Sequence, residues 1–167
     1  MGFLPVPSDD QLSADAVAAR NRRQDAHPGP IRPLDRALLN SVPVFEAYAG
    51  WLDVREELEP LVGERAVTLL SLAIAESCAA PYCVAEFRGA LEAGGDDPDA
   101  PQVTEAERLL LDWGRAVACD EVPADLAARV EAAFQPRTRA VLAGYAGLTI
   151  AVAAFSRIAG LEPDTAP

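Results

Sequence analysis

The sequence has 167 residues but no lysine, and it contains a single histidine, His27. Its 14 basic residues are all arginine and stand against 26 acidic residues, which gives a formal net charge of -12. A charge of this sign repels a phosphate backbone and an anionic membrane. We therefore predict that neither nucleic acid nor a membrane is a partner.

His27 lies beside Pro28, Gly29 and Pro30, and turn chemistry of this kind predicts a solvated loop. A histidine-centred catalytic triad or a zinc site of the His/Cys type would have to use this one residue. The sequence also has no P-loop, no Gly-x-Gly-x-x-Gly after a strand and no His-Glu-x-x-His motif. We therefore predict no metal and no cofactor.

Only three cysteines are present, which is too few for a disulfide scaffold in a chain of this length. Cys78 and Cys83 form a close pair, whereas Cys119 stands alone and is predicted to be structural. Residues 1–10 contain no basic residue and are interrupted by Pro5 and Pro7, unlike a secretory signal. We therefore expect a cytoplasmic protein.

Aromatic residues make up only 6% of the chain, although 50% of it is hydrophobic. A core built from alanine, leucine and valine favours helices, and no segment has the alternation of a strand. The predicted organisation is a polar N-terminal arm at 1–31, one all-helical domain at 32–163 and a tail at 164–167.

Prolines and glycines mark where the predicted helices begin and end. Residues 8–24 are predicted either to form a short charged helix or to remain an arm. The prolines that follow, up to Pro33, interrupt any helix before the next segment begins. The other helices are predicted at about 42–58, from Gly63, from Pro81 to Gly94-Gly95, from a capping box of Thr104 and Glu107, from Pro123 and from Pro136.

Residues 140–156 carry no charge, which raises the question of a membrane span. The run is slightly shorter than the roughly 20 apolar residues that a span needs, and it is rich in alanine and glycine. Small residues such as Gly144 and Gly147 allow helices to approach closely. We therefore predict a central core helix or a subunit-interface helix.

The stretch around Cys83 resembles a thiol site at the start of a helix. With Pro81 as the first helical residue, Cys83 lies in the first turn, where the helix dipole favours a thiolate. Glu86 lies on nearly the same face and opposes a thiolate, and Arg88 is the only basic neighbour. On a continuous helix Cys78 and Cys83 point about 140° apart, so a disulfide needs a break at Pro81. Either a reactive thiol or a buried, inert one is compatible with this pattern.

Glu76 ends a strongly apolar segment, where a carboxylate is costly to bury unless it is paired or protonated. We expect it to face an internal cavity and to act as a general acid or base, with a pKa raised by burial. Thr68 and Leu72 rise along the same side of the helix and would line this cavity. The alternative is that Glu76 sits at the helix end, where it reaches water or an arginine.

Residues 64–94, with Leu-Leu-Ser-Leu-Ala-Ile-Ala leading into Tyr82-Cys83, resemble the alkylhydroperoxidase-D-like, or carboxymuconolactone decarboxylase-like, family. Residues 42–45, 134–136 and 157–163 are also similar to this family, so that the likeness covers 32–163. The resemblance implies an all-helical fold that assembles as a homo-oligomer, commonly a dimer, trimer or hexamer. It also implies a thiol motif at a helix start.

Members of the family that are thiol peroxidases carry a glutamate, two cysteines separated by two residues, and a histidine four residues beyond the second cysteine. Aligning Tyr82-Cys83 with the family's Tyr-Cys places Thr68 at the glutamate and Ala80 at the first cysteine. Phe87 then occupies the histidine position, so only Cys83 of the four is retained. Peroxide reduction is therefore predicted to be weak or absent, and the histidine chemistry of the decarboxylases has no partner here.

Three classes of function follow. The first is a cofactor-independent enzyme acting on a small organic molecule by proton transfer, elimination or decarboxylation, with Glu76 as its acid or base. The second is a thiol oxidoreductase using Cys83 and Cys78. The third is a non-catalytic binding or assembly protein, favoured if Phe87 and leucines fill the family's pocket. The residues expected to contact the small molecule are Thr68, Tyr82, Glu86 and Phe87.

Overall fold

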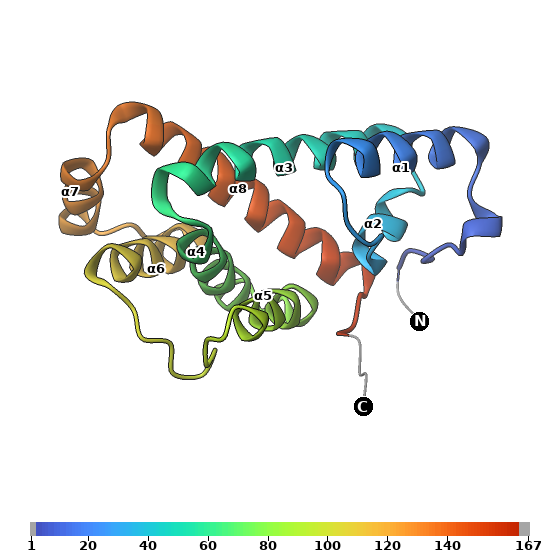
Figure 1. Ribbon diagram of the computed structural model, residues 1–167. Coiled ribbons are helices and arrows are strands. Elements are labelled where there is room, and N and C mark those ends of the chain that lie inside the picture. Colours follow the sequence, from blue (N-terminus) through green and yellow to red (C-terminus); the bar gives the residue numbers. More distant parts are fainter. Residues whose placement is uncertain (1–2, 164–167) are drawn as a thin grey trace.

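A computed structural model describes residues 3–163, and within this range the chain is all-helical, with no strand (Figure 1). The predicted all-α class is thus confirmed. The elements are a 3-10 helix η1 (Asp9–Gln11) and eight α-helices: α1 (Ala14–Ala26), α2 (Pro33–Leu38), α3 (Val42–Val62), α4 (Glu64–Ser77), α5 (Pro81–Ala93), α6 (Glu105–Ala118), α7 (Ala124–Ala133) and α8 (Pro136–Ala159).

Most helices begin and end near the prolines, glycines and capping residues from which their boundaries were predicted. Gly63 separates α3 from α4 with a φ of 97°, a conformation that glycine adopts without the strain a side chain would bring. Thr104 and Glu107 form the predicted capping box of α6, and Pro81 and Pro136 each occupy the first turn of their helices. The six-residue helix α2 was not predicted, because it is too short to show an apolar period.

Helix α4 forms the centre of the molecule, and α3, α5, α6 and α8 all contact it. Every residue from Ala66 to Ala75 is buried, as expected for a helix that is apolar nearly all round. The start of α5, which carries Tyr82 and Cys83, is held between this central helix and α8 (Figure 1).

Helix α8 packs along α3 but is buried on one side only. In its most apolar stretch of 18 residues only 33% of the residues are buried, so the prediction of a core helix applies to one of its faces. By length and composition α8 could also cross a membrane, and it is the one helix of residues 3–163 that could. A core helix of a soluble protein meets the same criterion, so this is weak evidence for a span.

The polar residues before Pro33 form a helix, the first of the two alternatives. Helix α1 packs on α3 through Ala16, Ala19 and Arg23, which are all buried. Preceding it, the chain is tied to the end of α2, because the Asn40 side-chain amide donates to the Pro5 carbonyl at 2.8 Å. Residues before Pro33 therefore pack against α2 and α3. One of them, Arg23, reaches the site described below.

Candidate functional site

The start of α5 meets α2 and α3 at a polar cluster that is largely buried. Arg32 is at its centre and contacts three side chains. Its guanidinium donates to the Tyr48 hydroxyl at 2.6 Å, to Asp35 Oδ2 at 3.3 Å and to Glu86 Oε2 at 3.5 Å. We call Arg32, Asp35, Tyr48 and Glu86 the Arg32 cluster. It brings one predicted site residue, Glu86, together with three that the sequence pattern did not indicate.

Asp35 is the most deeply buried member of the Arg32 cluster, with 0% of its surface exposed. Its Oδ2 atom accepts from the Arg32 backbone N–H at 2.9 Å and lies 3.9 Å from the buried Arg23 guanidinium. Its Oδ1 atom has no hydrogen-bond partner in the structure. A carboxylate this deep is tolerated only when cations offset it, and here two arginines do so.

Tyr48 links the Arg32 cluster to the core. Burial raises the pKa of Tyr48 to about 12, although the nearby Arg32 charge opposes the rise. The side chain therefore remains a neutral phenol at physiological pH. Because its oxygen accepts a hydrogen bond from Arg32, its proton is available for donation to another acceptor.

Cys83 and Tyr82 occupy the first turn of α5, as predicted, and both are buried. The Cys83 Sγ atom lies 3.5 Å from Ser156 Oγ of α8. Burial raises the pKa of the Cys83 thiol, and the contact with Ser156 opposes this rise only in part. The first-turn position therefore does not produce a stabilised thiolate, and the structure matches the buried alternative.

The other two cysteines are also free thiols. Cys78 is half-buried at the end of α4, and burial raises the pKa of its thiol against the effect of the neighbouring Arg157. Cys119 is exposed at the end of α6. It contributes nothing to the core, so the structural role predicted for it is wrong.

Glu76 does not face an internal cavity, and this expectation is wrong. It is exposed in the last turn of α4, although the ten residues of the apolar segment before it are buried. The helix emerges from the core at this turn, which removes the burial on which the acid–base role depended. Thr68 is buried, but its hydroxyl donates to the Glu64 carbonyl of its own helix. Thr68 and Glu76 thus have different surroundings and share no cavity.

Phe87, which was expected to contact a small molecule, is buried with Leu91 in the core. Its ring packs against other apolar side chains in the core. A filled position here is what the sequence analysis associated with the third class of function.

His27 is not solvated in a loop, contrary to prediction. Its Nδ1 atom lies 2.7 Å from Glu56 and its Nε2 atom 3.1 Å from Asp53, both on α3. Only 14% of its side chain is exposed. The histidine therefore fastens the end of α1 to α3, which holds Arg23 near Asp35.

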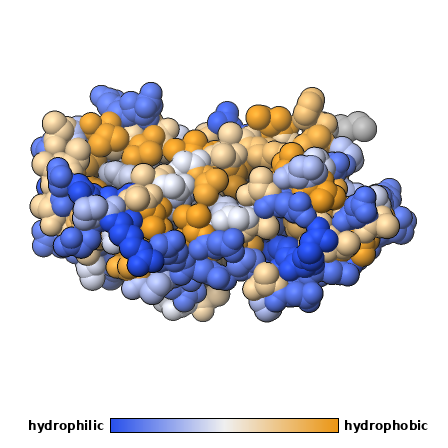
Figure 2. Space-filling view, turned by 90° about the horizontal axis from the view of Figure 1, so that it is seen from above, coloured by the Kyte–Doolittle hydropathy of each residue, from blue (hydrophilic) through white to orange (hydrophobic). Residues whose placement is uncertain are grey.

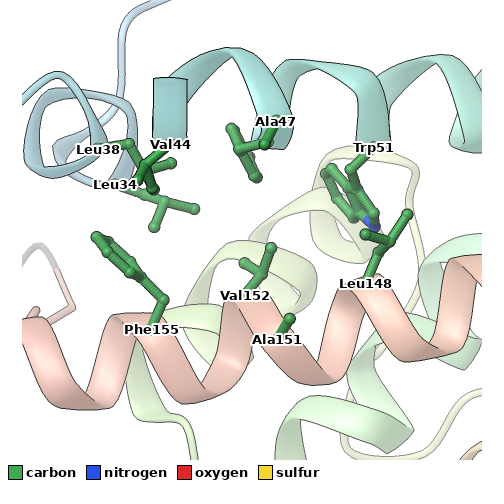
Figure 3. A pocket seen from close by; sticks show the side chains of 10 residues that line it. Leu34, Leu38, Val44, Ala47, Trp51, Leu148, Ala151, Val152 and Phe155 are labelled. Atoms are coloured by element: carbon green, nitrogen blue, oxygen red, sulfur yellow. The ribbon is translucent and has the colours of Figure 1, made fainter. Parts of the chain in front are cut away.

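A separate apolar pocket of about 180 Å³ lies between α3 and α8 (Figure 3). Tyr48 and Trp51 carry its only polar side-chain groups, and Tyr48 also belongs to the Arg32 cluster. Sequence reasoning missed this pocket because its two walls are about a hundred residues apart in the chain. Its lining is Leu34, Leu38, Val44, Ala47, Tyr48, Trp51, Leu148, Ala151, Val152 and Phe155.

Two aromatic residues that line this pocket, Tyr48 and Trp51, belong to a stack of three rings that continues to Tyr145 in the core. The Tyr48 and Trp51 ring centroids are 5.6 Å apart, and those of Trp51 and Tyr145 are 5.4 Å apart. Trp51 is 3% exposed, and its indole N–H has no hydrogen-bond partner. In the close view, the nitrogen edge of the indole is turned toward Leu148 of α8 (Figure 3). A residue that lines the pocket thus carries a buried donor without a partner.

The burial of the thiols predicts a marked difference in their reactivity. Because its pKa is raised, Cys83 carries less thiolate than an ordinary thiol at any given pH, and burial also restricts access. Iodoacetamide should therefore modify Cys83 at least about tenfold more slowly than the exposed Cys119. The pH midpoint of the Cys83 reaction should be displaced upward. Peptide mass spectrometry of time points checks both, with urea-unfolded protein as the control in which the rates converge.

No protein-family model matches the chain, and no curated protein is significantly similar to it in sequence. The resemblance to the alkylhydroperoxidase-D-like family therefore stays a prediction.

Proposed function

We propose that this protein binds a small, largely apolar organic molecule carrying a hydrogen-bond acceptor in the pocket between α3 and α8, and needs no cofactor to do so. The observation that carries the proposal is an apolar pocket lined by Trp51, whose buried indole N–H has no hydrogen-bond partner. An acceptor on the ligand would relieve a penalty of about 1–3 kcal/mol for that donor after a small adjustment of the side chains.

The size of the pocket limits the ligand. A closed cavity of ~150 Å³ lined by aliphatic and aromatic residues is large enough to hold benzene. A pocket of about 180 Å³ therefore suits a single ring or a short aliphatic chain. The carbonyl compounds of this size, such as cyclic ketones and aromatic aldehydes, combine the apolar body with the acceptor.

Among the chemical roles open to such a ligand, proton transfer has more support than thiol chemistry. The Arg32 cluster offers a neutral phenol, Tyr48, and a half-exposed carboxylate, Glu86, both in contact with one guanidinium. Cys83 by contrast is buried and has a raised pKa. A cofactor-independent enzyme would therefore use Tyr48 as proton donor, and a simple binding protein would use the pocket alone.

Filling the pocket should abolish ligand binding without unfolding the protein. Ala151 lines the pocket from α8 and is exposed, so Ala151→Leu places three added carbon atoms at the pocket without opening the core. We expect the dissociation constant for cyclohexanone to rise by at least about tenfold, because one added side chain occupies much of so small a volume. Ligand-observed NMR with cyclohexanone as the probe measures this.

Ala128→Leu is the matched control, because Ala128 is exposed on α7 and does not line the pocket. It should bind as the wild type does. Cyclohexane, which has the same ring but no acceptor, should bind more weakly than cyclohexanone. Equal binding by wild type and Ala151→Leu would contradict the proposed site.

A further inference from the structure

A second pocket, of about 320 Å³, lies between the segment that follows α1 and residues 51–59 of α3. It shares only Trp51 with the apolar pocket between α3 and α8. Seen from above, the side on which α1 and α3 lie, the surface has hydrophilic residues along one long edge and a hydrophobic band along the other (Figure 2). The second pocket is polar, because its lining includes three arginines, one histidine and two glutamates.

Arg23 lines this pocket and keeps a donor that the fold does not use. It is 8% exposed, and within residues 3–163 its guanidinium makes one hydrogen bond, from Nη1 to the His27 carbonyl at 3.2 Å. Its Nε atom has no partner, and Asp35 lies 3.9 Å from Nη2, which is too far for a hydrogen bond. A buried charged donor left unpaired is costly. An acceptor in the pocket would therefore stabilise Arg23 after a small shift of its guanidinium.

Arg55 lines the same pocket and also has unused donors. In the part of the chain that the structure describes, its guanidinium makes one hydrogen bond, from Nε to Glu59 Oε1 at 2.7 Å. Both of its Nη groups are thus left without a protein acceptor there. The side chain is 24% exposed, so a ligand that enters from solvent can reach it.

The charges around the pocket match an anion that carries one negative charge. The lining holds three arginines against Glu56 and Glu59, which leaves an excess of one positive charge. Asp35 is fully buried beside Arg23 and Arg32 and offsets part of this excess. A doubly charged anion would be repelled by these acids and by the net charge of -12.

The rest of the lining suits an organic body attached to that charge. Leu52, Pro28 and Pro30 line the pocket and offer apolar contacts, and the two prolines are exposed at its opening. A closed cavity of ~150 Å³ is large enough to hold benzene. A pocket of about 320 Å³ therefore has room for a ring together with a carboxylate.

We propose that this second pocket binds a small organic carboxylate, whose oxygens accept hydrogen bonds from Arg23 and Arg55. The planar guanidinium carries its donors in a fork that matches the two oxygens of a carboxylate. Arg32 adds positive charge while it stays bonded to Asp35 and Tyr48. This site is separate from the pocket between α3 and α8 and does not rest on the function proposed for it.

The experiment uses ligand-observed NMR with benzoate as the probe. We expect wild-type protein to bind benzoate with a dissociation constant of about 1 mM or below. Arg55→Ala should raise this constant at least about tenfold, because it removes charge-assisted donors and leaves Glu59 facing the carboxylate. The circular dichroism spectrum should not change, since the hydrogen bond of Arg55 is to a residue of its own helix.

Arg115→Ala is the matched control, with the same change of charge. Arg115 also pairs with an acid of its own helix, Asp112 on α6, and it does not line the pocket. This variant should bind benzoate as the wild type does. Benzamide, which has the shape of benzoate without the charge, should bind wild-type protein at least about tenfold more weakly.

Glu59→Gln tests the charge of the pocket in the opposite direction. It removes a negative charge from the lining, so benzoate should bind about threefold more tightly. Glu57→Gln changes the charge by the same amount on the same helix but outside the pocket, and it should have a smaller effect. A residue with a purely structural role would not give tighter binding when substituted.

Several results would overturn the proposal: no binding of benzoate by the wild type, binding that is insensitive to Arg55→Ala, or tighter binding of inorganic phosphate than of benzoate. Ala151→Leu fills the pocket between α3 and α8 and should leave benzoate binding unchanged. Loss of benzoate binding in Ala151→Leu but not in Arg55→Ala would place the carboxylate in that other pocket and would equally overturn it. Cyclohexanone binding is measured separately, so its failure would leave the benzoate result intact.

Discussion

Asp35→Ala should lower the free energy of unfolding by about 3–5 kcal/mol, the range found when one member of a buried ion pair is removed. The substitution leaves the buried Arg23 without its acidic partner and leaves Arg32 with only the partly exposed Glu86. It also removes the acceptor of the Arg32 backbone N–H at the start of α2. Urea unfolding followed by circular dichroism gives the value.

Two variants separate the buried charge from a general effect of losing an ion pair. Glu46→Ala removes the partner of Arg22 at the surface, where both side chains are more than half exposed, and should change stability by less than ~1 kcal/mol. Asp35→Asn keeps an acceptor but not the charge, so it should fall between the two. A loss below ~1 kcal/mol for Asp35→Ala would show that the Arg32 cluster tolerates an uncompensated guanidinium.

Tyr145→Ala should cost about 3–5 kcal/mol of unfolding free energy, the range for removing a large aromatic side chain from a core. Tyr145 is fully buried, stacks on Trp51 and lies 2.6 Å from the Ser71 hydroxyl of α4. The cavity left would lie between α3, α4 and α8, and α3 and α8 carry most of the residues that line the pocket. Thermal and urea unfolding measure the loss.

Tyr145→Phe isolates the hydroxyl from the ring. Ser71 also donates to the Val67 carbonyl at 2.7 Å, so its own oxygen keeps a partner when the tyrosine hydroxyl is gone. The expected cost is therefore only about 1 kcal/mol. If the alanine and phenylalanine variants lost equal stability, the hydroxyl pair and not the aromatic stack would dominate at this position.

Part of the candidate site could be predicted from the sequence. Pro81 placed Tyr82 and Cys83 in a first helical turn, and the structure has both residues there. The Arg32 cluster was missed, although Asp35 follows Arg32-Pro33 at the spacing of a helix cap and could have been identified on that basis. That Arg32 also meets Tyr48 and Glu86 depends on how α2, α3 and α5 pack, which no local pattern contains.

The sequence by itself determined the helices. Prolines fix φ and lack an N–H, and glycines allow turns that other residues resist. The spacing of apolar residues selects the buried face of each helix. All three effects act over a few neighbouring residues. Three features were decided only by the tertiary structure. These are the exposure of Glu76, the contact between Cys83 and Ser156, and the pocket that Tyr48 and Trp51 form with α8. These outcomes depend on where one helix leaves the core and which distant helix covers it. Contacts between segments a hundred residues apart are set by packing of the whole chain, and a local pattern carries no record of them.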